Sequence, residues 1–177
     1  MILAFTRFMP LLTALFLWGA LLYPSSADAE LYAGGAFALL RKIPPGESLA
    51  AANTFLGSKF FNRTVDKKEG IGIRRWGTKK DPWFLEALHD REMIRAIRVT
   101  WPTLDRGKQQ TLFAQLTREG KNFFGRRGRF LGDGKIEWRE LNGKWLVRAE
   151  IKRGEMESVT LLSGIRDAEM GSERYGF

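Results

Sequence analysis

Few side chains in this sequence of 177 residues could carry out catalysis. His89 is the only histidine, and the sequence has no cysteine. A histidine-dependent triad would need His89, but no Gly-x-Ser-x-Gly motif accompanies it. One imidazole and scattered carboxylates also make no preorganised set of metal ligands. We therefore expect a solvated turn at His89, no metal, no cofactor and no enzymatic activity.

Two pairs of carboxylates have a spacing that could serve acid–base chemistry at a glycosidic bond. They are Glu137 with Glu140 and Glu155 with Glu157. Both pairs fall on predicted strands or turns, where solvated surface charges are the simpler interpretation. The glycine-rich piece Gly132-Asp133-Gly134 lacks the lysine and following hydroxyl of a phosphate-binding loop, so we predict a turn there.

A basic stretch is the feature that most suggests a class of ligand in a chain of net charge +9. Its cations are Arg118, Lys121, Arg126, Arg127 and Arg129, with Phe123, Phe124 and Phe130 interleaved. Clustered cations bind polyanions by releasing counterions, and glycines at 125 and 128 would let a loop bend around one. The alternative is a solvated basic surface with Phe123 and Phe124 simply buried.

A pair of tryptophans indicates an internal duplication, because Trp76 and Trp83 recur as Trp138 and Trp145 after 62 residues. With the same shift, seven further positions are identical: Ala52/Ala114, Lys59/Lys121, Phe61/Phe123, Gly70/Gly132, Gly72/Gly134, Ala87/Ala149 and Arg91/Arg153. We expect two similar units that share one core, with the tryptophans buried in it. The alternative is that Trp76 and Trp138 lie on an open sheet face as binding anchors.

The periodicity places matching elements in the two copies, over residues 43–101 and 104–163. The predicted elements are a helix over 49–61 capped by Ser48, a turn-like segment over 63–70, strands over 71–76, 83–88 and 93–101, a helix over 108–123, strands over 135–141 and 144–152 joined by an Asn142-Gly143 turn, and a strand over 156–162. The predicted fold class is α+β, with two tandem helix-plus-antiparallel-meander repeats forming one sheet and helices on one face. A single domain is expected over 30–163, followed by a loose tail over 164–177.

A resemblance to a known family accompanies this pattern. Gly46-Glu47-Ser48, then Ala52 and Phe55-Leu56-Gly57, followed by a tryptophan strand and two more strands, resembles the repeat unit of the beta-lactamase inhibitor proteins. The small lipoproteins of the barrel-assembly machinery are similar. The resemblance implies a concave sheet backed by helices and a role in binding another protein. The second copy departs from the pattern, with Thr117-Arg118 in place of Leu-Gly, and the disulfide and lipid-acceptor cysteines are absent.

The first 29 residues are typical of a secretory signal. Arg7 precedes an apolar run over 11–23, and Ala27-Asp28-Ala29 provides a cleavage site before Glu30. The alternative is a retained membrane anchor. We expect a periplasmic or secreted chain with no stable membrane span after processing, since the apolar run over 31–40 is too short to cross a bilayer.

Three functions are compatible with these expectations. The favoured one is a non-catalytic binding protein that engages a protein of the cell envelope through its sheet face. The second is an envelope polyanion binder that uses the basic stretch from Arg118 to Arg129 on lipopolysaccharide or phospholipid headgroups, while export disfavours nucleic acid. The third is an outer-membrane β-barrel, suggested by the final Phe177 and alternating strands but disfavoured by the helix over 108–123.

Overall fold

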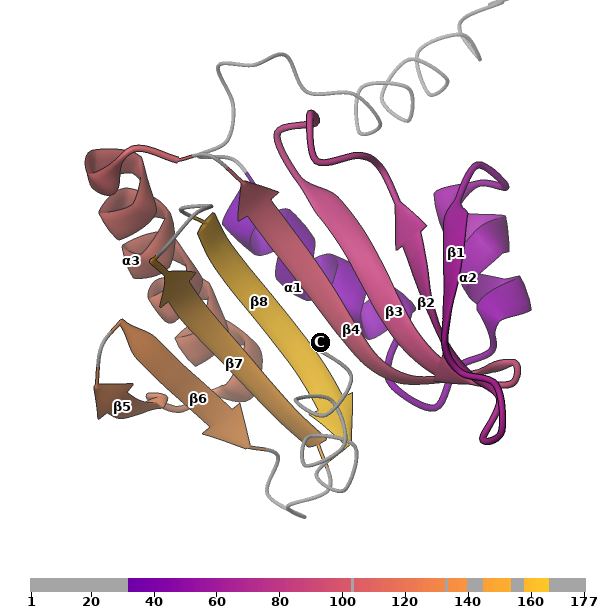
Figure 1. Ribbon diagram of the computed structural model, residues 1–177. Coiled ribbons are helices and arrows are strands. Elements are labelled where there is room, and N and C mark those ends of the chain that lie inside the picture. Colours follow the sequence, from indigo (N-terminus) through magenta and orange to yellow (C-terminus); the bar gives the residue numbers. More distant parts are fainter. Residues whose placement is uncertain (1–31, 103, 133, 140–144, 154–157, 166–177) are drawn as a thin grey trace, which may run out of the picture.

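The computed structural model describes residues 32–102, 104–132, 134–139, 145–153 and 158–165 (Figure 1). The predicted signal peptide, the predicted Asn142-Gly143 turn and most of the predicted tail lie outside these residues. Among the described residues, no helix is long and apolar enough to span a membrane. The elements in this part of the chain are α1 Tyr32–Lys42, α2 Leu49–Leu56, β1 Phe61–Asp66, β2 Ile71–Trp76, β3 Phe84–Asp90, β4 Met93–Pro102, α3 Arg106–Phe124, β5 Arg129–Gly132, β6 Lys135–Arg139, β7 Trp145–Lys152 and β8 Ser158–Ile165.

All these strands belong to one antiparallel sheet, in the order β1-β2-β3-β4-β8-β7-β6-β5. The first four strands form one meander and the last four form another, and the two meanders join where β4 pairs with β8. The three helices lie behind the same face of the sheet, and α1 packs against α3 (Figure 1). The predicted fold class is confirmed: α+β, with two helix-plus-meander repeats in a single sheet.

The two meanders share the register of their middle strands. Trp76 lies opposite Leu85 in the first meander, and Trp138 lies opposite Val147 in the second. Both pairs are related by the 62-residue shift seen in the sequence, as are the middle strands as a whole. The tryptophan repeat therefore marks structurally equivalent positions.

The shift changes outside the middle strands. The helices α2 and α3 each end at a glycine that lies four residues before the next strand, so Gly57 and Phe61 correspond to Gly125 and Arg129. The connection between β1 and β2 is longer than that between β5 and β6, so equivalent residues before these connections are more than 62 positions apart. The identities at 52/114, 59/121 and 61/123 therefore do not pair equivalent residues. Those three matches are coincidental in structural terms.

Local chemistry explains where the helices begin and end. Ser48 caps α2 by accepting a hydrogen bond from the backbone N–H of Ala51 at 3.1 Å, as predicted. The helix ends at Leu56 because Gly57 has a φ of 91°, a value that disfavours residues with a Cβ. The predicted extension to Phe61 is wrong, and Phe61–Asp66 forms β1 where a charged turn was predicted.

Both outer strands are irregular. Each pairs on one side only, β1 with β2 and β5 with β6. The register of β1 shifts between Thr64 and Asp66, and that of β5 shifts between Phe130 and Gly132. These bulges interrupt the two free edges of the sheet.

The hydrophobic core lies between the sheet and the helices, and it contains the two repeat tryptophans. Trp76 is 5% exposed and Trp138 is 1% exposed. Trp138 stacks on Phe124 of α3 with ring centroids 6.4 Å apart, and Trp76 donates from Nε1 to the Gly57 carbonyl at 3.3 Å. Core burial of this pair is confirmed. The alternative that places both on the open face as binding anchors is wrong, because alternation along β2 and β6 directs them toward the helices.

Candidate functional site

The face of the sheet opposite the helices carries a row of charged side chains. Successive cross-strand partners run from β2 to β5 as Arg75, Glu86, Arg98, Leu162, Arg148, Glu137 and Arg129. We call these seven residues the charged row. The pairing of neighbouring strands places them on one face, because partners in an antiparallel ladder point to the same side.

In the first meander, a buried glutamate binds two arginines. Glu86 is 3% exposed. Arg75 donates from Nε to Glu86 Oε1 at 2.9 Å, and Arg98 donates from Nε to Oε2 at 3.1 Å. Each guanidinium therefore occupies one oxygen, and both side chains are held in place on the sheet.

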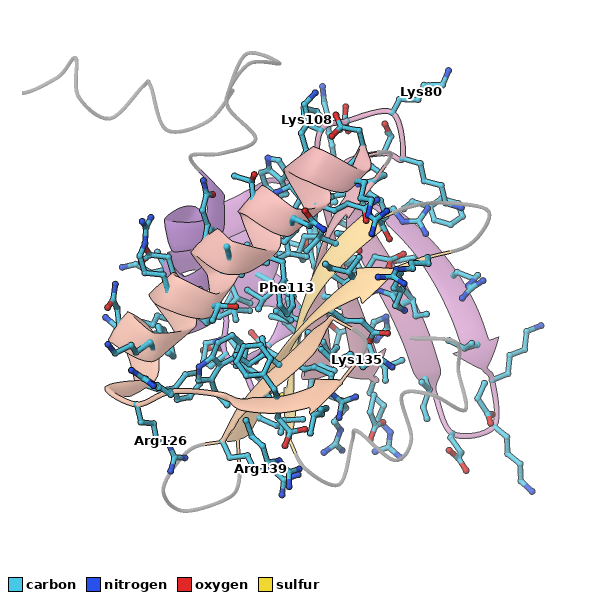
Figure 2. All side chains as sticks on the ribbon, turned by 90° about the vertical axis from the view of Figure 1, so that its left-hand side faces the viewer. Lys80, Lys108, Phe113, Arg126, Lys135 and Arg139 are labelled. Atoms are coloured by element: carbon cyan, nitrogen blue, oxygen red, sulfur yellow. The ribbon has the colours of Figure 1, made fainter. Side chains whose placement is uncertain are left out.

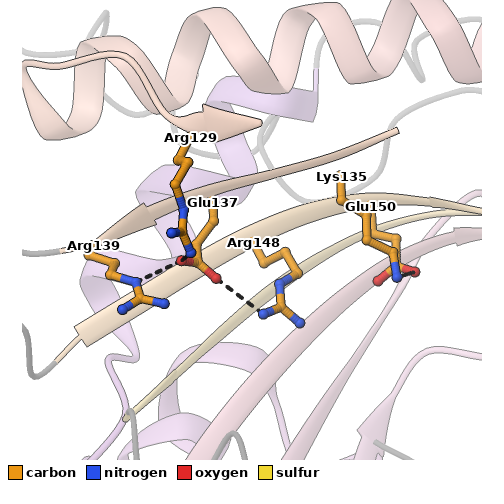
Figure 3. A network of polar contacts seen from close by, with 6 residues as sticks. All are labelled: Arg129, Lys135, Glu137, Arg139, Arg148 and Glu150. Atoms are coloured by element: carbon orange, nitrogen blue, oxygen red, sulfur yellow. Dashed lines mark hydrogen bonds and ion pairs between the residues drawn. The ribbon is translucent and has the colours of Figure 1, made fainter. Parts of the chain in front are cut away.

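In the second meander, a buried glutamate binds three arginines (Figure 3). Glu137 is 3% exposed, and it accepts from Arg139 Nε at 2.6 Å, from Arg148 Nη2 at 3.1 Å and from Arg129 Nη2 at 3.3 Å. The prediction of a solvated strand-face charge at Glu137 is wrong. Arg129 and Arg139 flank it on the strands β5 and β6, and both remain substantially exposed.

The two networks occupy equivalent positions in the two repeats, but the glutamate and the arginine have exchanged strands. Arg75 lies opposite Glu86 on β2 and β3, and the residues that the repeat aligns with them are Glu137 and Arg148 on β6 and β7. Arg98 and Leu162, at the junction of the meanders, lie between the two pairs. The same ionic contact is thus built twice, in opposite polarity.

The arginines determine the ionisation of both glutamates. Burial favours the neutral carboxyl group, but Arg98 and Arg75 more than offset it and lower the pKa of Glu86. At Glu137 burial is likewise outweighed, by Arg139 and Arg148, and its pKa is also lowered. Both carboxylates are therefore ionised at neutral pH. With four arginines and two glutamates, the charged row keeps a net positive charge, and Arg139 beside Glu137 adds another cation.

Another cation extends this positive region along β7. Desolvation and the charge of Arg98 lower the pKa of Lys152, and Glu150 partly opposes them. Lys135 is paired with Glu150 at 3.1 Å (Figure 3). The anions on this part of the face are thus already engaged with cations.

The predicted basic stretch does not form one loop. Arg118 and Lys121 lie on α3, Arg126 and Arg127 lie in the following turn, and Arg129 begins β5. All five are exposed, and they lie near the corner where the end of α3 meets β5 at the edge of the sheet. Figure 2 shows Arg126 at this corner. Arg129 joins this corner to the charged row through Glu137.

The aromatic residues of that stretch divide between core and surface. Phe123 lies 5.3 Å from Phe37 of α1, and Phe124 stacks on Trp138, so these two phenylalanines contribute to packing. Phe130 is 66% exposed and Leu131 is 39% exposed on β5. We call the five cations of the basic stretch together with Phe130 and Leu131 the β5 corner.

His89 lies within β3, where a solvated turn was predicted. The ring is half-buried, its Nδ1 is 2.8 Å from the Arg91 carbonyl, and it fills the space above Gly72. Burial lowers its pKa. The position suits a neutral packed histidine better than a ligand or a base.

Sequence reasoning missed the centre of the charged row. It singled out Arg129 but not Arg75, Arg98, Arg139 or Arg148, because each is isolated along the chain and becomes a neighbour only through strand pairing. The predicted hairpin put Glu86 and Arg98 on neighbouring strands, but their pairing depends on the extension of β3 to Asp90 and on the register shift between Leu88 and His89, which the sequence pattern did not show.

Comparisons with known protein families, with characterised proteins and with solved structures give no match. The function must therefore be argued from the geometry of the charged row and the β5 corner.

Proposed function

We propose that this chain is a non-catalytic binding protein that engages an acidic face of another protein through the charged row. The observation that carries the proposal is the pair of buried glutamates that fix five arginines on one sheet face. The resemblance to the beta-lactamase inhibitor proteins implies the same kind of role. With export as predicted, the partner would be a protein of the cell envelope.

The way in which the arginines are held favours a folded partner. A guanidinium has five N–H donors, and each glutamate contact uses only part of them. The remaining donors stay in fixed positions, so binding a carboxylate costs little side-chain entropy. Arginine is enriched in protein interfaces, and complementary charge mainly gives specificity and fast association.

The proposal of a non-catalytic role rests on the state of the two carboxylates. Glu86 and Glu137 are ionised and occupied by arginine donors. A general acid must hold a proton near neutral pH, and a general base must have a free lone pair directed at substrate. Neither requirement suits these residues, whose role here is to position arginines.

The test is capture of partners from crosslinked cell envelopes, with the mature chain as bait. Arg129→Glu with Arg139→Glu reverses two exposed charges of the site and should abolish capture of specific partners. Lys80→Glu with Lys79→Glu makes the same change of charge in an exposed connection and should leave capture intact. Equal capture by both double variants would contradict the proposal.

The second candidate function is binding to an anionic envelope surface through the β5 corner. Its support is the exposure of Phe130 beside five exposed cations, a combination that suits the boundary between headgroups and acyl chains. Flotation with vesicles that contain anionic phospholipid would test it. Binding should weaken steeply with salt and with Arg126→Glu, and Phe130→Ser should weaken it further. Indifference to all three changes would exclude this candidate.

A further inference from the structure

We infer that a cavity between the start of α3 and the end of β7 binds a small oxyanion, either a carboxylate or a phosphate. The cavity has a volume of about 270 Å³ and is lined by Arg106, Gln109, Gln110, Ile151 and Arg153. It lies on the helix side of the sheet, since the side chain of Ile151 is directed toward α3. The site is therefore separate from the charged row, and it stands independently of the proposed function.

Two arginines line this cavity, one at the start of α3 and one just after β7, and among the residues that the structure describes no carboxylate lines it. Among the described residues, neither Arg106 nor Arg153 forms an ion pair. Two arginines that share a cavity repel each other, and an oxyanion between them removes that repulsion and accepts from both. Arg106 also begins a helix of 19 residues, whose amino end adds a partial positive charge.

Asp105, the residue before Arg106, is already engaged with α3. Asp105 accepts a hydrogen bond from the backbone N–H of Lys108 at 2.8 Å, and its other oxygen is 3.5 Å from Lys108 Nζ. The backbone bond from Lys108 lowers the pKa of Asp105 and fixes the group as the cap of α3. Asp105 is thus directed at its own helix and does not line the cavity.

The remaining lining residues define the kind of ligand. Gln109 is 4% exposed and donates from Nε2 to the Leu104 carbonyl at 2.7 Å, so its amide is held in a fixed orientation. Ile151 supplies an apolar wall. Two cations, an amide and an apolar wall within a pocket of this size suit a small anion with a short carbon skeleton or none.

Isothermal titration of the full chain with inorganic phosphate and, separately, with succinate tests the inference. We expect saturable binding of at least one of them. Binding should weaken about tenfold or more with Arg106→Gln and with Arg153→Gln, since each removes a charged donor. A preference for phosphate or for succinate assigns the class of oxyanion, and binding of neither overturns the inference.

Two further variants separate this site from the general positive charge of the chain. Gln110→Glu keeps the shape of the side chain and places a negative charge in the lining, so it should abolish binding without loss of the fold. Lys80→Gln removes an exposed charge in the connection between β2 and β3 and should leave binding unchanged. Equal weakening by Lys80→Gln and Arg106→Gln would overturn the inference, because it would show charge-driven association without a site.

Discussion

Glu137 on β6 lies directly opposite Arg148 on β7, and the two side chains are joined at 3.1 Å in the polarity opposite to that of Arg75 and Glu86. The repeat therefore preserves an ionic contact while exchanging its charges. We therefore expect the stability contributed at this position to depend on having opposite charges on the two neighbouring strands, whichever strand carries the glutamate.

A double-mutant cycle at this pair tests that dependence. Glu137→Arg alone places a cation among Arg129, Arg139 and Arg148 and should be the most destabilising change. Combining it with Arg148→Glu restores opposite charges, so we expect a favourable coupling of about 1–3 kcal/mol in urea unfolding. Strictly additive effects would show that the pair does not interact.

Removing Glu137 should destabilise the chain more than removing an arginine that surrounds it. Glu137→Ala leaves Arg148 half-buried without its carboxylate, and we expect a loss of about 3 kcal/mol in the free energy of unfolding. Arg129→Ala removes a side chain that is 67% exposed, and the loss should be under about 1 kcal/mol. Chemical denaturation measures both, and equal losses would contradict the burial of the network.

Acid should weaken the fold through the two glutamates. Both have a lowered pKa in the folded chain, so the folded state binds fewer protons there than the unfolded state does. Their stabilisation is present above the unfolded pKa of about 4.3 and is lost as the pH falls through the folded pKa. The free energy of unfolding should decline below about pH 5, and Glu86→Gln with Glu137→Gln should flatten the decline. An unchanged slope would rule out these residues as the cause.

Two glycines should resist substitution because Trp138 lies against them. A Cβ at Gly120 would collide with the indole of Trp138, and one at Gly128 would lie 2.7 Å from Ile136 Cγ1 and 2.8 Å from the indole. Gly120→Ala and Gly128→Ala should each cost about 1–3 kcal/mol through overpacking. Gly34→Ala in α1 is the control, since its nearest neighbour is 3.9 Å away and alanine favours a helix. Its stability should be unchanged or higher in the same urea experiment.

Fluorescence quenching by acrylamide should report the burial of the repeat tryptophans. Trp76→Phe and Trp138→Phe remove shielded fluorophores, so the quenching of the remaining signal should be equal or steeper than in the parent. Trp83→Phe removes a half-buried indole and should make quenching shallower. A shallower slope for Trp138→Phe would mean that its ring is accessible to solvent.

The sequence predicted the inner strands well because their patterns come from burial. Ile97, Val99 and Trp101 alternate along the strand, and all three lie in the core. The same alternation predicts Met93 and Arg95 on that face, but the register shift between Leu88 and His89 leaves both exposed. The strands on either side of the predicted Asn142-Gly143 turn also pair as predicted, from Lys135 to Arg139 against Leu146 to Glu150.

The outer elements were missed because their residues are largely solvated. β1 carries Asn62, Arg63 and Thr64, all exposed, so its composition is that of a turn and hides the strand. β5 has only four residues, each exposed.

The helix α1, which starts at Tyr32, was not predicted because its two glycines and apolar run gave no clear helical period.

The charged row was unpredictable for a different reason. Its members are separated along the chain and converge only once the seven strands from β2 to β5 in the sheet are in register. Even the pairing of Glu86 with Arg98 depends on a register shift within one hairpin, and no sequence pattern shows that Arg148 reaches the same row from the other repeat.

The bulges in β1 and β5 have a consequence for how concentrated solutions of this protein behave. A regular open sheet has unpaired backbone donors and acceptors along both edge strands, and a strand of a neighbouring molecule can pair with them. Here each edge strand is short, and its pairing register shifts near its last residues. Each also carries an exposed arginine, Arg63 on β1 and Arg129 on β5. Regular, uncharged borders would favour pairing between the sheet edges of neighbouring copies, and the bulges with their arginines oppose it.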